Sequence, residues 1–225
     1  MKNTILGFPG DWMVTPEILE AAKLSLPMIR EFYDKQGEVE CFKTPFRQIV
    51  SEPLKGEEIY SVPFLSEAYC KLLLDEVRDN PSFQPNPDED ELRQIPEIIM
   101  DRHLPSAYTA LASVVDRVIR PLIWELWGTL TNYTHIQIAN YNLRDKRQGA
   151  WHHDQSADIT IVVPLNTGNY SGGGTEFWGR GIVDPLPTGH ALIFPSLTHM
   201  HRGLPVSSGD RFLLVFWLKA RHGQE

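Results

Sequence analysis

The chain has 225 residues, of which 42% are hydrophobic and 22% are charged, as in a globular domain rather than a disordered or fibrous chain. Its formal net charge of −8 disfavours a general nucleic-acid or anionic-membrane binder, because such proteins need a positive field. Two cysteines, Cys41 and Cys70, cannot form a disulfide framework. No stretch approaches 18 apolar residues and the start does not resemble a signal peptide, so we expect a cytoplasmic protein that crosses no membrane.

The first half of the chain carries helix signals. Residues 15–17 (Thr-Pro-Glu) favour a helix start, and apolar residues follow at helical spacing until Pro27, where we expect a kink or a restart. A short strand is predicted over 57–63, and Ser66 then caps a second helix. The buried stripe of that helix is predicted to be Ala68, Leu72, Leu73 and Val77.

A loop and a third helix complete this half. Residues 81–96 hold four prolines and a run of acids, which favours a solvated surface connection, with a lid over a site as the alternative. Ser106 opens the third helix, and Pro121 is expected to kink or divide it.

Short apolar strands follow from residue 134 onward. They are predicted over 134–141, 158–165, 190–194 and 211–218, and glycine-containing turns separate them. Many short strands at close spacing are typical of a jelly roll. The sequence therefore predicts a mainly β fold, a double-stranded β-helix (jelly roll) core flanked by N-terminal helices.

A His-x-Asp triplet lies just before the second of these strands. Side chains two apart in extended chain point the same way, so His152 and Asp154 can face one point while His153 faces away. Alone, this triplet is more often a surface turn. A second cluster, around His199 and His201, adds an imidazole after the 190–194 strand. Two histidines and one carboxylate can hold iron and leave positions open for a bidentate cosubstrate and dioxygen.

Arg211 is the third element, at the start of the last strand and ten residues after His201. An arginine that faces into a barrel is costly unless it meets an anion, and its planar guanidinium suits the far carboxylate of 2-oxoglutarate. A salt bridge to Asp210 is the simpler explanation for the arginine alone. Together, the ordered histidines, aspartate and arginine have the pattern of the Fe(II)- and 2-oxoglutarate-dependent oxygenases.

Several further segments resemble the C-terminal catalytic domain of the procollagen-lysine 5-dioxygenases, the collagen lysyl hydroxylases, and their viral and microbial relatives. The resemblance covers about residues 57–218 and is strongest in the second half. The segments that carry it are residues 58–65, Tyr141, Leu165-Asn166, the Tyr-Ser-Gly-Gly-Gly-Thr-Glu-Phe run at 170–177 and residues 195–205.

The resemblance implies a role for each matched residue. His152, Asp154 and His201 match the iron ligands, and Arg211 matches the arginine that holds 2-oxoglutarate. Tyr141 matches a further cosubstrate contact, with a barrel-wall aromatic as the alternative. The family pattern selects His201 rather than His199, because the spacing to the arginine fits His201 only. It also divides the chain into a helical extension, 1–56, and a dioxygenase domain, 57–225.

The departures from the family concern the substrate more than the metal. Trp151 replaces a proline before the histidines, Ser171 replaces a glutamate before the glycines, and residues 1–56 match no segment of the family. Trp151 and Trp178 are candidates for the rim of the pocket, with ordinary packing as the alternative.

The resemblance implies an enzyme, a hydroxylase that uses Fe(II), 2-oxoglutarate and dioxygen, and it admits ascorbate as an accessory reductant. The expected substrate is a lysyl or other amino-acid side chain in a peptide; the alternative is a free amino acid or another small metabolite. The resemblance is also compatible with a homodimer. The rival from another class is a non-enzymatic jelly-roll protein that binds a metal or has a structural role.

Overall fold

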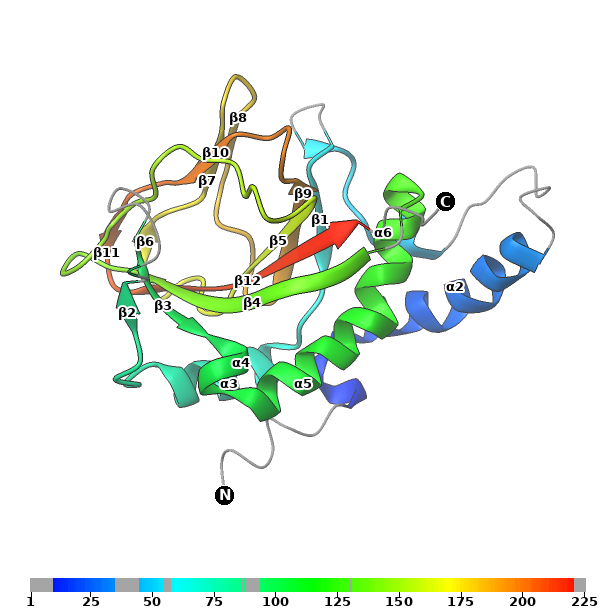
Figure 1. Cartoon of the computed structure of the whole chain (residues 1–225), viewed down its shortest axis with the longest axis horizontal. Helices are drawn as coiled ribbons and strands as arrows, with labels where there is room; N and C mark the ends of the chain where they lie inside the picture. Colours follow the sequence, from blue (N-terminus) through cyan, green and yellow to red (C-terminus); the bar gives the residue numbers. More distant parts are fainter. Residues whose placement is uncertain are drawn as a thin grey trace.

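The computed structural model describes residues 10–34, 45–54, 58–85, 87, 94–129 and 131–220. Its largest element is a seven-stranded antiparallel sheet with the strand order β1-β9-β5-β12-β4-β3-β2 (Figure 1). The strands of this sheet are β1 (Tyr60–Pro63), β2 (Gln84–Pro85), β3 (Pro96–Ile99), β4 (Thr131–Tyr141), β5 (Ile159–Pro164), β9 (His190–Pro195) and β12 (Arg211–Ala220).

Two smaller antiparallel sheets lie across from the large sheet, on the side away from the helices (Figure 1). One has the order β10-β7-β8 and the other pairs β11 with β6. Their strands are β6 (Ser171–Gly172), β7 (Thr175–Phe177), β8 (Gly181–Val183), β10 (His201–Gly203) and β11 (Val206–Ser208). The fold is therefore the mainly β jelly roll that the sequence predicts.

Helices cover the other face of the large sheet (Figure 1). They are η1 (Asp11–Met13), α2 (Pro16–Asp34), η2 (Pro45–Gln48), α3 (Glu67–Val77), α4 (Met100–His103), α5 (Pro105–Val114), the π-helical η4 (Val115–Ile119) and α6 (Arg120–Trp127). Strand β12 shows how the sheet separates two cores. Phe212, Leu214 and Phe216 join the core beneath the helices, whereas Leu213 and Val215 join a cluster inside the jelly roll.

The predicted strands are confirmed, and so is the division of the third helix near Pro121, whereas the restart considered at Pro27 is wrong. Helix α2 does not restart at Pro27 but runs through it. Near Pro121 the chain forms the π-helical η4 and then begins α6, with Pro121 in the first turn. A proline fits there because the first-turn N–H groups have no partner within the helix.

The cap of α3 is confirmed, but its buried stripe is partly wrong. The amide of Tyr69 donates to Ser66 Oγ at 3.1 Å. Ala68 is exposed and Leu72 is half-buried. The larger ring of Tyr69 takes the core position instead and packs edge-on against Trp12, with ring centroids 5.3 Å apart. The buried residues of α3 are Tyr69, Cys70, Leu73, Leu74 and Val77.

The ends of the predicted loop at 81–96 form strands that the sequence does not predict. Gln84 pairs with Glu97, and β3 continues alongside β4. The acidic run, and with it the question of a lid, lies outside the described residues.

Residues before position 56 share the core beneath the helices, since Met13, Ile18 and Phe46 are buried in it. A domain boundary at 56 stays a prediction. Among the helices that the structure describes, none is both long and apolar enough to cross a bilayer.

Gly189 is expected to tolerate no side chain, because of its backbone conformation and the main chain packed against it. Its φ is +81°, and a Cβ there would lie 2.1 Å from the carbonyl oxygen of Leu65. Gly168 also has a positive φ, +95°, but has open space around it. We expect Gly189→Ala to lower the free energy of unfolding by about 2–5 kcal/mol and Gly168→Ala by only about 1 kcal/mol. Urea unfolding of both variants tests this; equal losses would contradict it.

Candidate metal centre

Two backbone hydrogen bonds join the segments that carry the candidate histidines. His201 is the first residue of β10, and His152 lies in the segment before β5. The amide of His152 donates to the carbonyl of His201 at 3.0 Å, and the amide of His201 donates back at 2.9 Å. This antiparallel bridge places the two imidazoles side by side, with ring centroids 4.4 Å apart.

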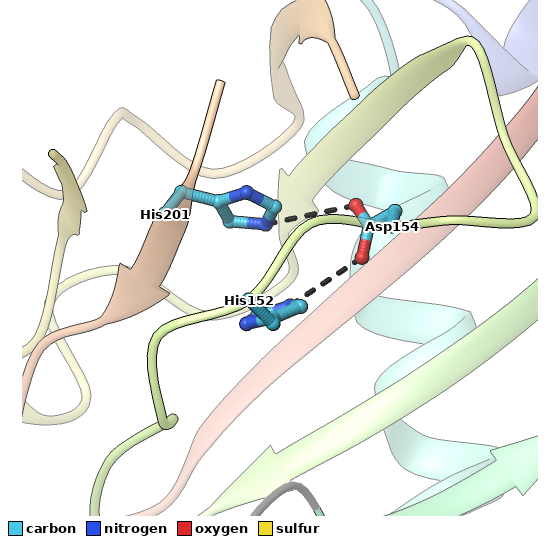
Figure 2. A group of neighbouring side chains, drawn as sticks. All are labelled: His152, Asp154 and His201. Atoms are coloured by element: carbon cyan, nitrogen blue, oxygen red, sulfur yellow. Dashed lines mark ion pairs between the residues drawn. The ribbon is translucent and has the colours of Figure 1, made fainter. Parts of the chain in front are cut away.

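Asp154 completes a compact group of donor atoms (Figure 2). One ligand atom from each of His152, Asp154 and His201 lies within 4.8 Å of the others. The Nε2 atoms of His152 and His201 are 3.4 and 3.6 Å from the two carboxylate oxygens. Ligands bound at about 2.1 Å to one ion lie about 3 Å apart, so a small inward movement suffices to coordinate a cation.

The tautomers of both histidines suit a metal. His152 Nδ1 lies 2.8 Å from the carbonyl oxygen of Ala150, and His201 Nδ1 lies 3.0 Å from that of His199. Because a carbonyl only accepts, each Nδ1 carries a proton, and each Nε2 is the atom left to present a lone pair to a metal ion once it has lost any proton of its own.

The surroundings of the group also fix its charge state. Burial alone would raise the pKa of Asp154, but the hydrogen bond from His152, the charges of the two histidines and the Thr160 hydroxyl lower it well below its usual value. Thr160 in turn lies 2.7 Å from Ser196 Oγ. Burial lowers the pKa of His201 to about 4, although Asp154 favours its protonated form. At neutral pH the group is thus a carboxylate beside a neutral imidazole.

This donor set fits Fe(II). Two imidazole nitrogens and one carboxylate on one side of an ion leave its other positions open, which is the arrangement of non-haem iron oxygenases. Only oxygen and nitrogen donors are present, and both histidines have the backbone partners that orient metal ligands.

The group lines a cavity of about 600 Å³ inside the jelly roll. Arg211 and Tyr141 line the same cavity and lie opposite each other on β12 and β4. The guanidinium carbon of Arg211 lies 5.6 Å from the centre of the Tyr141 ring. Metal-ligand candidates and the candidate anion-binding residue therefore open onto one space.

Arg211 is 3% exposed, and it does not form the local salt bridge that was the simpler explanation. Asp210 pairs instead with Arg144, at 3.0 Å. Within the described part of the chain, Nε and Nη1 of Arg211 have no hydrogen-bond partner. Buried guanidinium N–H groups without an acceptor are costly, which favours an anion as their partner.

Tyr170 adds a second donor that the sequence reasoning did not single out. Its hydroxyl is buried and, among the described residues, has no hydrogen-bond partner. Tyr170 and Arg211 pack against the same glycine: a Cβ on Gly173 would lie 3.2 Å from the tyrosine ring and 3.1 Å from Arg211 Cδ. The only signal in the sequence is that Tyr170 opens the glycine run.

Two other histidines stay outside the group of donors. His153 lines the cavity but is not part of the cluster, although it was expected to face away. His199 is buried, with Nδ1 2.9 Å from the hydroxyl of Thr198.

Trp151 and Trp178 pack against each other edge-on, with centroids 5.1 Å apart. Trp178 is 61% exposed, and neither ring lines the cavity. Both rings therefore pack on each other outside the set of residues that line the cavity, and a role at its rim stays a prediction.

Several of the known proteins that resemble this chain are oxygenases. No protein-family model matches the chain. The chain is 23% identical over 176 residues to the multifunctional procollagen lysine hydroxylase and glycosyltransferase of Caenorhabditis elegans, covering 72% of this chain and 24% of that protein. It is 25% identical over 183 residues to the human 2-oxoglutarate and iron-dependent oxygenase domain-containing protein 2, covering 73% and 49%.

The fold resembles the crystal structure of a Pseudomonas putida prolyl-4-hydroxylase, with a TM-score of 0.60, 19% identity and coverage of 76% of this chain and 96% of that one. The chain spans between a quarter and a half of the length of the two curated relatives. In sequence and in fold, the chain resembles the 2-oxoglutarate- and Fe(II)-dependent oxygenases, as predicted.

Burial of His201 makes the stability of the metal-free protein depend on pH. The pKa of His201 is about 4 in the folded protein, whereas an unfolded histidine titrates near 6.5. Between these values the unfolded chain binds more protons, so the free energy of unfolding falls as pH drops from about 6.5 to 4, by up to about 3 kcal/mol. His201→Gln removes this contribution. Urea unfolding in EDTA at several pH values measures it, and identical slopes for both proteins would contradict it.

Proposed function

We propose that the protein is an Fe(II)- and 2-oxoglutarate-dependent dioxygenase that hydroxylates an unactivated C–H bond. In this proposal His152, Asp154 and His201 hold the iron, and Arg211 binds the far carboxylate of 2-oxoglutarate. One observation carries the proposal: a buried group of two histidines and a carboxylate opens onto the same cavity as a buried guanidinium. The metal needs the histidine and carboxylate ligands, the anionic cosubstrate needs the guanidinium, and both must lie in the same cavity for the cosubstrate to reach the metal.

When bound, the iron supplies the redox chemistry that couples the oxidation of 2-oxoglutarate by dioxygen to hydroxylation of the substrate. The protein supplies geometry. The carbonyls of Ala150 and His199 orient the two imidazoles, and the hydroxyl of Thr160 holds the carboxylate of Asp154 in place. Burial of His201 and Asp154 excludes water from one side of the centre.

The anion-binding end of the cavity has more than one donor. Arg211 presents a fork of N–H groups, which matches a carboxylate in a bidentate manner. The Tyr170 ring packs on the same glycine as Arg211 and lines a smaller adjoining pocket with it, and its buried hydroxyl, unpartnered among the described residues, is the proposed second donor. Tyr141 packs beneath the guanidinium and against the backbone of Gly203, which limits the movement of both side chains.

The proposed substrate is a lysyl or other amino-acid side chain in a peptide. The name of the Caenorhabditis elegans relative, a procollagen lysine hydroxylase, supports this class. A cavity of about 600 Å³ that also receives 2-oxoglutarate has room for one side chain, so the rest of a peptide would lie outside. A free amino acid or small metabolite is the alternative. Ascorbate, a homodimer and a cytoplasmic location stay predictions.

The first prediction from this proposal concerns turnover. Wild-type protein with Fe(II), 2-oxoglutarate and dioxygen should form succinate, and candidate peptides should gain one oxygen by mass. Asp154→Ala and His201→Ala should lose at least about 99% of succinate formation, because each removes a metal ligand. His103→Ala, on exposed α4, is the control and should keep it. If neither turnover nor an anaerobic iron–2-oxoglutarate absorbance band appears in the wild type, the non-enzymatic rival is favoured.

A second prediction separates the two donors of the anion-binding end. Arg211→Lys should raise the KM for 2-oxoglutarate more than about tenfold, because the bidentate contact is lost. Tyr170→Phe should raise it about three- to tenfold, as expected for one hydrogen bond to a charged group, with kcat changed less. Tyr60→Phe, whose ring packs on Trp127, is the matched control. An unchanged KM in Tyr170→Phe would exclude Tyr170 from the carboxylate site.

A further inference from the structure

A buried amide side chain, that of Asn166, lies beside the strand that carries Arg211, and the proposed chemistry does not use it. Asn166 is 7% exposed and lies just after β5, where the chain turns away from the large sheet. Strand β5 pairs with β12, and the amide of Leu165 still donates to the carbonyl of Phe212 at 3.0 Å. Asn166 is the next residue, at the point where the main chain of this segment leaves the ladder.

The side chain of Asn166 continues the hydrogen bonding along β12 in place of the main chain. Its Oδ1 accepts from the amide of Phe212 at 3.0 Å, and its Nδ2 donates to the carbonyl of Asp210 at 2.8 Å. A flipped amide would bring two donors and two acceptors together, so these partners also fix its orientation. Asp210 and Phe212 are the residues on either side of Arg211. One side-chain amide therefore fixes the main chain before and after the candidate anion-binding residue.

The place of Arg211 in its strand makes this support important. Arg211 is the first residue of β12 and lies opposite Tyr141, the last residue of β4, so it is at the end of its ladder. Residues 207–209, just before it, are exposed. Bidentate binding of a carboxylate needs a guanidinium held to within about 0.5 Å. Packing against Tyr141 and Gly173 limits the side chain of Arg211, and Asn166 limits its main chain.

We propose that Asn166 is a positioning residue: by holding the main chain at Asp210 and Phe212, it sets the guanidinium of Arg211 for bidentate contact with the far carboxylate of a keto diacid. The inference rests on the proposed function for the identity of that anion. Asn166 is not among the residues that line the cavity, so it acts on the ligand through Arg211. Its loss should therefore weaken binding of the far carboxylate and leave the metal-binding end unchanged.

A pair of ligands separates this role from a general contribution to folding. 2-Oxoglutarate and 2-oxovalerate share the keto acid end that chelates a metal, but 2-oxovalerate has a methyl group in place of the far carboxylate. Calorimetric titration of the Mn(II)-loaded protein gives the Kd of each ligand without turnover. The ratio of the two Kd values measures the contact that Arg211 makes. Wild-type protein should prefer the diacid about tenfold or more, as expected for a charge-assisted, bidentate contact.

Asn166→Ala removes both hydrogen bonds, and Asn166→Leu removes them while keeping a branched side chain of similar shape. Each should lower the preference for the diacid about three- to tenfold, while the Kd of 2-oxovalerate stays within about twofold of wild type. The matched control is Thr167→Val. Thr167 is the next residue of the same turn, and its hydroxyl donates to the carbonyl of Leu186 at 2.7 Å. This variant loses a hydrogen bond of the turn but none beside Arg211, so it should keep the wild-type preference.

A folded Asn166→Ala or Asn166→Leu protein that keeps the wild-type preference for the diacid would overturn the proposal. So would an equal loss of affinity for both ligands, or a failure of both variants to fold, because each of these results assigns Asn166 a role in folding alone. Failure of the proposed function looks different: wild-type protein would then not bind 2-oxoglutarate together with Mn(II), or would bind it no more tightly than 2-oxovalerate.

Discussion

The candidate site depends on the backbone bridge between His152 and His201. These residues are far apart in the chain, and the two hydrogen bonds between their main chains, at 2.9 and 3.0 Å, bring their rings to one point. The bridge is isolated, so no long ladder holds it. Its position follows from what flanks it: β10 pairs with β7, and the segment after His152 leads into β5 of the large sheet. A displaced strand in either sheet would separate the imidazoles.

Charge burial sets the second constraint. Asp154 and Arg211 are 8% and 3% exposed, and burial of an isolated ion costs several kcal/mol. Asp154 has partners in the metal-free protein, namely Thr160 and the two imidazoles. For Arg211 the described residues supply no acceptor to Nε or Nη1. The anion-binding end thus has buried donors without acceptors, and a dianion that bound there would stabilise the fold by RT ln(1 + [L]/Kd), where [L] is its free concentration.

Much of this arrangement could be predicted because its signals are local. The segments that form β4, β5, β9 and β12 have clear apolar patterns, and His201 and Arg211 are only ten residues apart in the chain. The roles of Tyr170 and Asn166 could not be assigned, because they depend on contacts between segments distant in sequence. Strand β3 has only four residues and begins with Pro96, and this pattern in a sequence is typical of a loop. In α3, Tyr69 replaced Ala68 in the core because Trp12 packs against it from outside the helix.

Contacts on the side of the His152–His201 bridge that faces away from the cavity hold the two histidine segments together without a metal. Neighbouring residues of an extended chain point to opposite sides, so Trp151 and Arg202 lie behind the two histidines. The guanidinium carbon of Arg202 lies 4.5 Å from the centre of the Trp151 ring, and its Nε donates to Glu176 at 2.7 Å. A cation–π contact and an ion pair each contribute roughly 0.5–1 kcal/mol at such half-exposed positions. The cation–π contact joins the two histidine segments from the side that faces away from the cavity, and the ion pair ties β10 to its neighbour β7. The metal-binding geometry is therefore held by contacts that neither metal nor cosubstrate makes, which lets the ligands be in place before the ion arrives.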